Sequence, residues 1–194
     1  MAKEFTLKNV RLSYAYLSKP VKYVQGQGNV EDETDGVYKT DLIIPKDSEA
    51  YKILMDAIKE LKSEALTSGI RAAGGKTVKV ANKDMARYYD GIKDGDTKED
   101  DIYTNSIIIS AKSSAEYKPQ LYNEAVEREE DTRFYSGCYA NVYVKAYNYQ
   151  AATNLGCAFR LSMLQFAADG DRLGSSAADA TSIFGAKKST DDMF

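Results

Sequence analysis

The chain has 194 residues, of which 43% are hydrophobic and 28% charged, a composition typical of soluble globular proteins rather than of disordered ones. It contains no histidine, which excludes His-ligated zinc, the Ser-His-Asp and Cys-His catalytic pairs, and any general base with an unperturbed pKa near neutrality. The formal net charge of −3 does not exclude a polyanionic partner, because many of the acidic residues lie in three windows, 31–35, 94–101 and 124–131, and basic residues predominate elsewhere.

Cysteine usage and hydropathy predict the compartment. Cys138 and Cys157 are too few for a disulfide framework and lie in strand-like patterns, which indicates buried free thiols in a reducing cytoplasm. The N-terminal residues lack a basic stretch followed by an apolar run, and no segment approaches the ~18 consecutive apolar residues of a membrane span. We therefore expect a cytoplasmic protein that has no membrane partner.

The first half of the chain predicts two strands and one long helix. Alternating apolar residues predict a strand over residues 5–14, and β-branched residues predict a second over Val37–Ile44. In the segment Asp47–Leu66 the apolar residues follow helical spacing, with Asp47 or Ser48 as the N-cap and Gly69 just beyond the end. This is the one long helix that we predict.

Residues 70–105 are polar and glycine-rich, and we expect an excursion with little regular structure. Gly74–Thr77 resembles the end of a phosphate-binding loop, but Ile70 stands where that loop requires its first glycine. Asp90–Asp101 resembles a calcium loop, but Ile92 replaces an oxygen donor at its third position. We therefore expect no nucleotide, no metal and no other cofactor.

The second half of the chain predicts three further strands. Ile107–Ala111 is a β-branched run, and residues 155–164 alternate, with an apolar set that includes Phe159 and Met163. The segment Cys138–Tyr149 is the most informative, because its even positions are all small and apolar and would face a core. Its odd positions are Tyr139, Asn141, Tyr143, Lys145, Tyr147 and Tyr149.

This tyrosine-rich face has two interpretations. It can pack against a helix, since tyrosine is a good strand former, or it can serve as a platform on which the bases of a single-stranded nucleic acid stack while lysine and arginine bind phosphates. Further aromatic and basic residues near the strands favour the second interpretation, and the small opposite face fits the interior of a small closed barrel. The candidate nucleic-acid-binding residues are Arg11, Lys112, Tyr117, Lys118, Arg133, Phe134, Tyr135, Tyr139, Tyr143, Lys145, Tyr147 and Tyr149.

Small and polar residues follow Gly174, which predicts a domain over residues 1–174 and a flexible tail over residues 175–194. An aromatic residue at the end of such a tail has no core to join. We therefore expect the tip of the tail to dock in a partner protein; its residues are Asp191, Asp192, Met193 and Phe194.

Taken together, these residues resemble the bacteriophage single-stranded DNA-binding proteins that have an OB fold and an acidic tail ending in phenylalanine. The segments that match are Val10–Tyr14, Tyr38–Lys46, Asp90–Asp101, Phe134–Tyr139 and Gly170–Gly174, and the resemblance covers most of residues 8–174. It implies a mainly β protein in which one long helix and extended loops lie between the strands of a five-stranded barrel. It also implies a non-catalytic protein that coats single-stranded DNA, without sequence preference, in phage DNA replication or recombination in the bacterial cytoplasm.

The resemblance further implies that the tail recruits replication proteins, such as a DNA polymerase, and competes with DNA for the basic groove. Lys187 and Lys188 make this tail less acidic than those of similar proteins, so we expect at most a small effect of such competition. Two alternatives stay open: a phage structural or assembly protein whose tyrosine face is a subunit interface, and a metal-dependent nuclease built from the acidic loops. A homo-oligomer also stays open.

Overall fold

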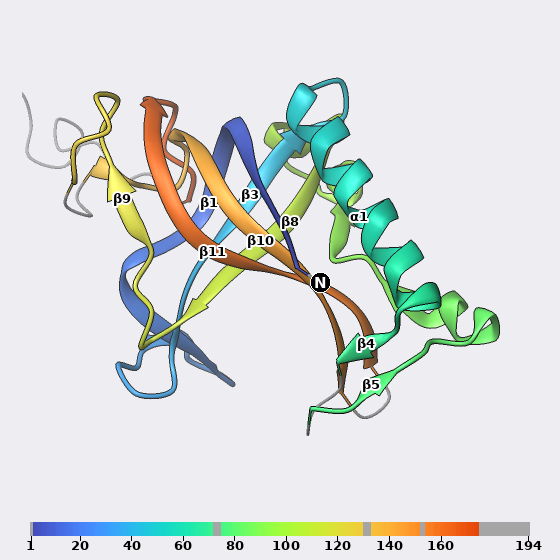
Figure 1. Cartoon of the computed structure of the whole chain (residues 1–194). Coiled ribbons are helices and arrows are strands. Elements are labelled where there is room, and N and C mark those ends of the chain that lie inside the picture. Colours follow the sequence, from blue (N-terminus) through green and yellow to red (C-terminus); the bar gives the residue numbers. More distant parts are fainter. Residues whose placement is uncertain (1, 72–74, 130–132, 152–153, 175–194) are drawn as a thin grey trace, which may run out of the picture.

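A closed barrel of five strands lies at the centre of the fold (Figure 1). The computed structural model describes residues 2–71, 75–129, 133–151 and 154–174. The barrel strands are β1 (Lys3–Val24), β3 (Val37–Pro45), β8 (Ser106–Ser114), β10 (Tyr139–Ala151) and β11 (Asn154–Ala168). They pair in the order β11, β10, β1, β3 and β8, and the parallel pairing of β8 with β11 closes the ring. The predicted fold class, a mainly β barrel of the OB type with one long helix, is confirmed.

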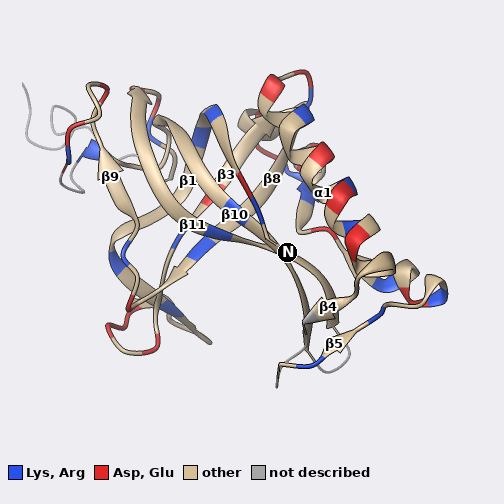
Figure 2. Ribbon diagram, viewed as in Figure 1, with Lys and Arg blue, Asp and Glu red and all other residues tan. Residues whose placement is uncertain are grey.

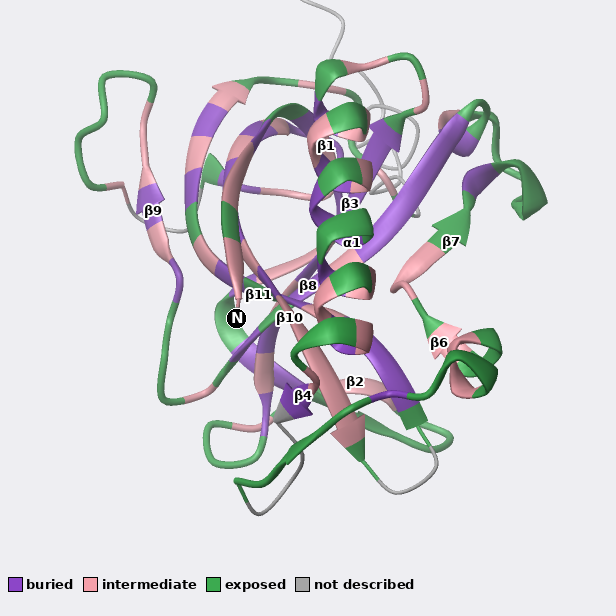
Figure 3. Cartoon of the chain, turned by 45° about the vertical axis from the view of Figure 1, so that its right-hand side comes forward, coloured by how far each residue is buried: buried purple, intermediate pink, exposed green. Residues whose placement is uncertain are grey.

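The interior of the barrel is filled by alternate residues of its strands (Figure 3). Cys138, Ala140, Val142, Val144 and Ala146 are all 0% exposed, as the period-two pattern predicts. The neighbouring strand β11 supplies the larger side chains that fill the remaining space, so small and large residues alternate across the narrow core. Both cysteines are buried free thiols, as expected.

A bulge in β11 corrects one part of the predicted core. Tyr143 of β10 pairs with Met163, but the next residue, Val144, pairs with Leu161. This extra residue in β11 reverses which side chains point inward. Met163, expected in the apolar set, is therefore 39% exposed on the outside, while Leu164 and Phe166 are buried in its place.

Strand β1 is much longer than the segment 5–14 that alternation predicts. It pairs with β10 near its start and with β3 further on, and its end forms a hairpin with β2 (Gly28–Glu31). The ladder shifts register between Leu7 and Val10 and again after Ser13, and Tyr14 has a φ of +49°. Because each shift breaks the period of two, alternation alone cannot follow this strand to its end.

The predicted helix is confirmed as α1 (Glu49–Thr67). The hydroxyl of Ser48 accepts a hydrogen bond from the backbone N–H of Tyr51 at 3.1 Å and caps the first turn. Gly69, with a φ of +85°, follows the last turn. One face of α1 is buried against β1, β3 and β10 (Figure 3), and its buried residues are Ala50, Leu54, Ala57, Ile58, Leu61 and Ala65.

Beyond the helix, the described residues of the excursion, 70–71 and 75–105, contain only short elements, as expected. Its strands are β4 (Ile70–Arg71), β5 (Thr77–Val78), β6 (Tyr88–Tyr89) and β7 (Ile92–Asp94), and its 3-10 helices are η1 (Asn82–Arg87), η2 (Gly95–Thr97) and η3 (Asp101–Tyr103). Two of the strands nevertheless join the main sheet, since β6 pairs with β11 and β7 pairs with β8.

The junction where β8 meets β11, which we call the seam, is short. The two strands share two residue pairs, Phe159 with Ala111 and Arg160 with Lys112. On one side of these pairs β6 and β7 line the edges that face each other across the seam, and on the other side β9 (Gln120–Tyr122) pairs with β11. In the described part of the chain, no helix is long and apolar enough to cross a membrane.

Candidate nucleic-acid interface

The tyrosine-rich face of β10 lies on the outside of the barrel. Tyr139, Tyr143, Tyr147 and Tyr149 are all half-buried, whereas the alternate residues between Tyr139 and Tyr147 are inside. In the described part of the chain, α1 contacts β10 on the side of Leu61 and Asn148, and no helix covers these four tyrosines as a continuous layer. The predicted division of β10 into a core face and an outer aromatic face is therefore confirmed, and the role of that outer face stays a prediction.

Four basic residues lie next to one another around the barrel, one on each of four adjacent strands. Lys39 of β3 pairs with Lys112 of β8, Lys112 pairs with Arg160 of β11, and Arg160 pairs with Lys145 of β10. Since register partners point to the same side of a sheet, all four side chains lie on the outer face. Figure 2 shows basic segments on β8, β10 and β11 where these strands pass one another. We call these four residues the cationic belt.

The belt is electrostatically unfavourable in the protein alone. Like charges directly opposite each other on neighbouring strands are destabilising. Burial, followed by the charge of Lys112, holds the pKa of Lys39 below its ordinary value. Among the described residues, Lys112 and Arg160 have no ion-pair partner within 4.0 Å. An anionic ligand would therefore relieve the repulsion within this row of like charges.

Lys145 is the one belt residue that forms an ion pair within 4.0 Å among the described residues. Its ammonium lies 2.6 Å from Oε1 of Glu4 on β1, and the hydroxyl of Tyr143 donates to Oε2 of Glu4 at 2.8 Å. The hydrogen bond from Lys145, followed by that from Tyr143, holds the pKa of Glu4 below its usual range. Glu4 therefore places a carboxylate where the belt could otherwise bind a phosphate oxygen.

Aromatic rings accompany the belt. The guanidinium of Arg160 lies 6.0 Å from the ring centroid of Tyr147, and the ammonium of Lys39 lies 5.3 Å from that of Tyr16 on β1. Both ends of the belt pair with β1, because Lys145 is the register partner of Glu4 and Lys39 is the register partner of Tyr16. Cations and π-faces are thus interleaved around the barrel, the combination that binds single strands of nucleic acid.

A pocket of about 540 Å³ opens beside the belt at the seam. Its walls include three tyrosines from two separate segments of the chain and two lysines. The residues that define this seam pocket are Tyr89, Lys93, Lys112, Tyr147, Tyr149 and Ala158. Its volume lies within the ~300–1,000 Å³ of small-molecule sites.

The residues that lead into β10 have other surroundings. Phe134 is buried in the core, 7% exposed, and its ring meets that of Phe166 edge-on, with centroids 5.9 Å apart. Arg133 forms a two-pronged ion pair with Glu124, with both N···O distances at 2.9 Å, and its guanidinium lies over Phe166. The structure thus places Phe134 inside the fold and gives Arg133 an acidic partner.

Arg11, Tyr135 and Tyr139 form a separate group at the start of β10. The guanidinium of Arg11 lies 5.8 Å from the ring centroid of Tyr139 and donates to the backbone carbonyls of Gly137 and Asp171. The hydroxyl of Tyr135 donates to Asp169 at 2.9 Å. This group lies about six residues along β10 from Lys145, or ~20 Å at the usual rise of a strand.

Tyr117 and Lys118 lie in the turn that follows β8. Tyr117 is 67% exposed, and its backbone carbonyl accepts a hydrogen bond from the hydroxyl of Ser113. The tail residues 191–194, predicted to contact a partner, lie outside the described residues.

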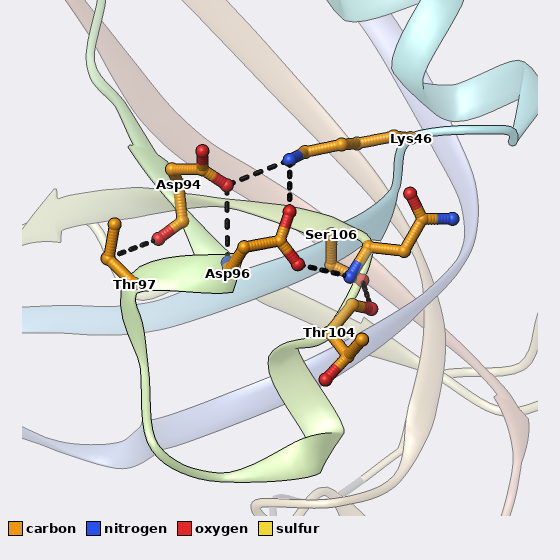
Figure 4. A network of polar contacts seen from close by, with 7 residues as sticks. Lys46, Asp94, Asp96, Thr97, Thr104 and Ser106 are labelled. Carbon is orange, nitrogen blue, oxygen red and sulfur yellow. Dashed lines mark hydrogen bonds and ion pairs between the residues drawn. The ribbon is translucent and has the colours of Figure 1, made fainter.

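The acidic stretch that resembled a calcium loop folds through contacts with a lysine (Figure 4). The ammonium of Lys46 lies 2.8 Å from Asp94 and 2.6 Å from Asp96, and these contacts hold the pKa of both carboxyls below their usual range. Asp96 also accepts the backbone N–H of Asn105. These carboxylates therefore have intramolecular partners.

Five aromatic and basic residues of the site were not among those predicted from sequence: Tyr16, Lys39, Tyr89, Lys93 and Arg160. Lys39 and Arg160 lie at outward-facing positions of predicted strands. The alternation of inward and outward residues could therefore have identified both as residues of the outer face. Tyr89 and Lys93 belong to the polar excursion, whose sequence carries no signal that it joins the barrel.

The chain is similar to proteins of bacteriophages. The sequence model of the family described as Enterobacter phage Enc34, ssDNA-binding protein, matches residues 3–194. The chain is also 32% identical over 174 residues to protein p50 of Acyrthosiphon pisum secondary endosymbiont phage 1, a match that covers 85% of this chain and 83% of that protein.

Two solved structures have a similar fold. The single-stranded DNA-binding protein from bacteriophage Enc34 in complex with ssDNA is 23% identical, with a TM-score of 0.65 over 88% of this chain and 89% of that one. The protein gp2.5, a single-stranded DNA-binding protein encoded by bacteriophage T7, is 17% identical, with a TM-score of 0.55 over 100% of this chain and 99% of that one.

Proposed function

Because the chain belongs to the family of the Enterobacter phage Enc34 ssDNA-binding protein, we propose that it binds single-stranded DNA across the outside of its barrel, along the cationic belt. The observation that carries this proposal is the register of Lys39, Lys112, Arg160 and Lys145 on four adjacent strands. A row of like charges lowers the stability of the protein alone, and a bound anion would offset this cost. The phosphates of a single strand supply the opposite charge.

The rings beside the belt fit the bases of the same strand. Tyr147 and Tyr16 each accompany a belt cation, so the backbone can follow the belt while bases stack at its sides. Stacking contributes ~1–3 kcal/mol per base and tolerates every base, because each has a π-face. Binding without sequence preference follows from this arrangement.

In the cell we assign the protein a non-catalytic role in phage DNA replication or recombination, in the cytoplasm of the host. Residues 1–174 form the DNA-binding domain, and residues 175–194 recruit a replication protein, such as a DNA polymerase, through the terminal Asp-Asp-Met-Phe. Support for recruitment comes from the sequence of that tail, in which an aromatic residue, Phe194, follows two acids, Asp191 and Asp192.

Titration of the full chain with oligo(dT) in EDTA tests the proposed function. The protein has 15 tyrosines and no tryptophan, so its ultraviolet emission reports on tyrosine alone. We expect saturable binding without metal and a substantial loss of emission. A nuclease would instead need metal to turn over the oligonucleotide. A virion protein that uses the face as a subunit interface would change neither the gel mobility of the oligonucleotide nor the tyrosine emission.

A further inference from the structure

We infer that the seam pocket holds one unpaired nucleobase of the bound strand and that Tyr89, on β6, is one of the rings on which this base stacks. The inference rests on the proposed function and extends it beyond the barrel strands, to a residue of the excursion. It also assigns the pocket a role in distinguishing single-stranded from duplex DNA.

The spacing of two tyrosines carries the first step. Tyr149 of β10 and Tyr89 of β6 are both register partners of Gly156 on β11, so they stand on either side of a residue that has no side chain. Two strand spacings separate their backbones by ~9–10 Å. Two rings that both touch a flat base are ~7 Å apart. The separation therefore leaves room for one base between the two tyrosines that line the pocket.

Glycines bring the excursion close enough to form this wall. A Cβ on Gly156 would lie 2.1 Å from the carbonyl oxygen of Tyr89, so only glycine permits β6 to approach β11 here. Gly91 has a φ of +76°, and a Cβ at this position would lie 2.6 Å from the ring of Phe159. The two glycines together fix the segment that carries Tyr89 against the seam.

Polar contacts beside the pocket hold the same segment in place. The hydroxyl of Tyr88 donates to Asn148 on β10 at 2.5 Å, and the amide of Asn148 donates to the backbone carbonyl of Leu61 in α1 at 2.8 Å. The thiol of Cys157 lies 3.0 Å from the carbonyl oxygen of Asp90, to which it donates. Because β6 is tied to the helix and to two barrel strands, Tyr89 is positioned before a ligand arrives, which lowers the entropic cost of binding.

The chemistry of the pocket matches a nucleotide of a single strand. Tyr89 is 47% exposed, so its ring is accessible. Lys93 and Lys112 lie at the same pocket and can bind the phosphates on either side of the base. The hydroxyl of Ser110, a further lining residue, already donates to Asp41, so its O–H is not available to donate to the edge of a base. The pocket therefore selects a flat aromatic ring beside phosphates rather than one particular base.

A base can enter this pocket only if it is not paired. The pocket thus supplies stacking energy to a single strand and none to a duplex, whereas the cationic belt attracts the phosphates of both. Loss of Tyr89 is expected to weaken binding of single strands selectively.

Binding of oligo(dT) and of a duplex of equal length, measured side by side in EDTA, tests the inference. We expect Tyr89→Ala to weaken oligo(dT) binding by roughly 5- to 150-fold, the equivalent of one lost stack. Duplex binding should stay within a factor of two of the parent value. Tyr89→Phe keeps the ring and should bind oligo(dT) like the parent. Tyr23→Ala, which removes a tyrosine that is 71% exposed at the hairpin end of β1, is the matched control.

A second variant guards against a folding defect in Tyr89→Ala. Ala158→Leu keeps all the tyrosines and places a larger side chain at a residue that lines the pocket, and it should weaken oligo(dT) binding at an unchanged melting temperature. If both folded variants bind oligo(dT) as tightly as the parent, the pocket does not hold a base and the inference is wrong. If the parent itself does not bind oligo(dT), the proposed function fails, and the inference fails with it.

Discussion

Lys39 on β3 and Lys112 on β8 are direct cross-strand partners on the outside of the barrel. Burial and the neighbouring charge of Lys112 lower the pKa of Lys39, so the protein alone carries this pair at a cost. A bound phosphate removes that cost. Binding and stability should therefore respond in opposite directions when one of the two charges is removed.

Replacing Lys112 with glutamine should weaken oligo(dT) binding at every salt concentration. The slope of log K against log salt should become shallower by about 0.7, the value for one phosphate contact to a single strand. The melting temperature should stay the same or rise by a few degrees, since relief of a like-charge pair is worth ~0.2–1 kcal/mol. Salt titrations and thermal melts of the same samples measure both effects.

Lys59→Gln is the matched control for this experiment, because Lys59 is an exposed lysine of α1, away from the belt. It removes the same charge and should leave the slope unchanged. Equal losses of affinity in the two variants would mean that only net charge matters and that the belt has no special role.

Replacing Glu4 with glutamine should strengthen oligo(dT) binding. The substitution releases Lys145 from its carboxylate partner and frees the hydroxyl of Tyr143. Because this ion pair is exposed, the gain should not exceed ~5-fold. Lys145→Glu should act in the opposite sense and weaken binding on every sequence.

The pH dependence of the Glu4 variant provides an internal check. The pKa of Glu4 is lowered by Lys145, so the ion pair is present above the ordinary carboxyl range and is lost as the pH falls through the lowered value. The advantage of Glu4→Gln over the parent should therefore shrink as the solution becomes acidic. An advantage that persists unchanged at the lowest usable pH would contradict this role of Glu4.

Phe134→Leu separates a core position from a stacking position. Because Phe134 is buried against Phe166, the substitution should lower the free energy of unfolding by roughly 1–3 kcal/mol. Oligo(dT) affinity, measured well below the melting temperature, should match the parent. Denaturant titration gives the first quantity and fluorescence titration the second, and weaker binding at unchanged stability would restore Phe134 to the interface.

Deletion of residues 191–194 should leave the melting temperature unchanged and single-strand affinity the same or slightly higher, since two acids are removed. It should abolish capture of the phage DNA polymerase by the immobilised protein. Phe194→Ala should do nearly as much, and Thr190→Ala should have no effect. Retention of the polymerase by the truncated chain, or a melting temperature several degrees lower, would exclude a docking role for the tail.

Periodicity was enough to predict the barrel strands and the helix. The small even positions from Cys138 to Ala146 predicted a closed core, and Asp47 or Ser48 with Gly69 predicted the ends of α1, at which the structure has Ser48 as the N-cap. Where the backbone departs from its period, prediction stopped. The bulge that turns Met163 outward follows from pairing with β10, and pairing is a property of two strands rather than of one.

The candidate site was predictable along one strand and not between strands. The row of tyrosines on β10 is visible in the sequence because its members are two or four residues apart. The belt is not visible, because Lys39 and Arg160 become neighbours of the same lysine only through the registers of three strands. Tyr89 reaches the site through the close packing that Gly156 permits, which no local pattern indicates.

The seam is the shortest ladder in the ring, and a ring opens most readily where it is joined by the fewest bonds. Lys112 lies on β8 and Arg160 on β11, one on each side of the seam. A single strand of DNA that contacts both residues would bridge β8 and β11. Barrel closure and DNA binding would then stabilise each other. In the proposed complex, bound DNA therefore makes the barrel more resistant to local opening at the seam.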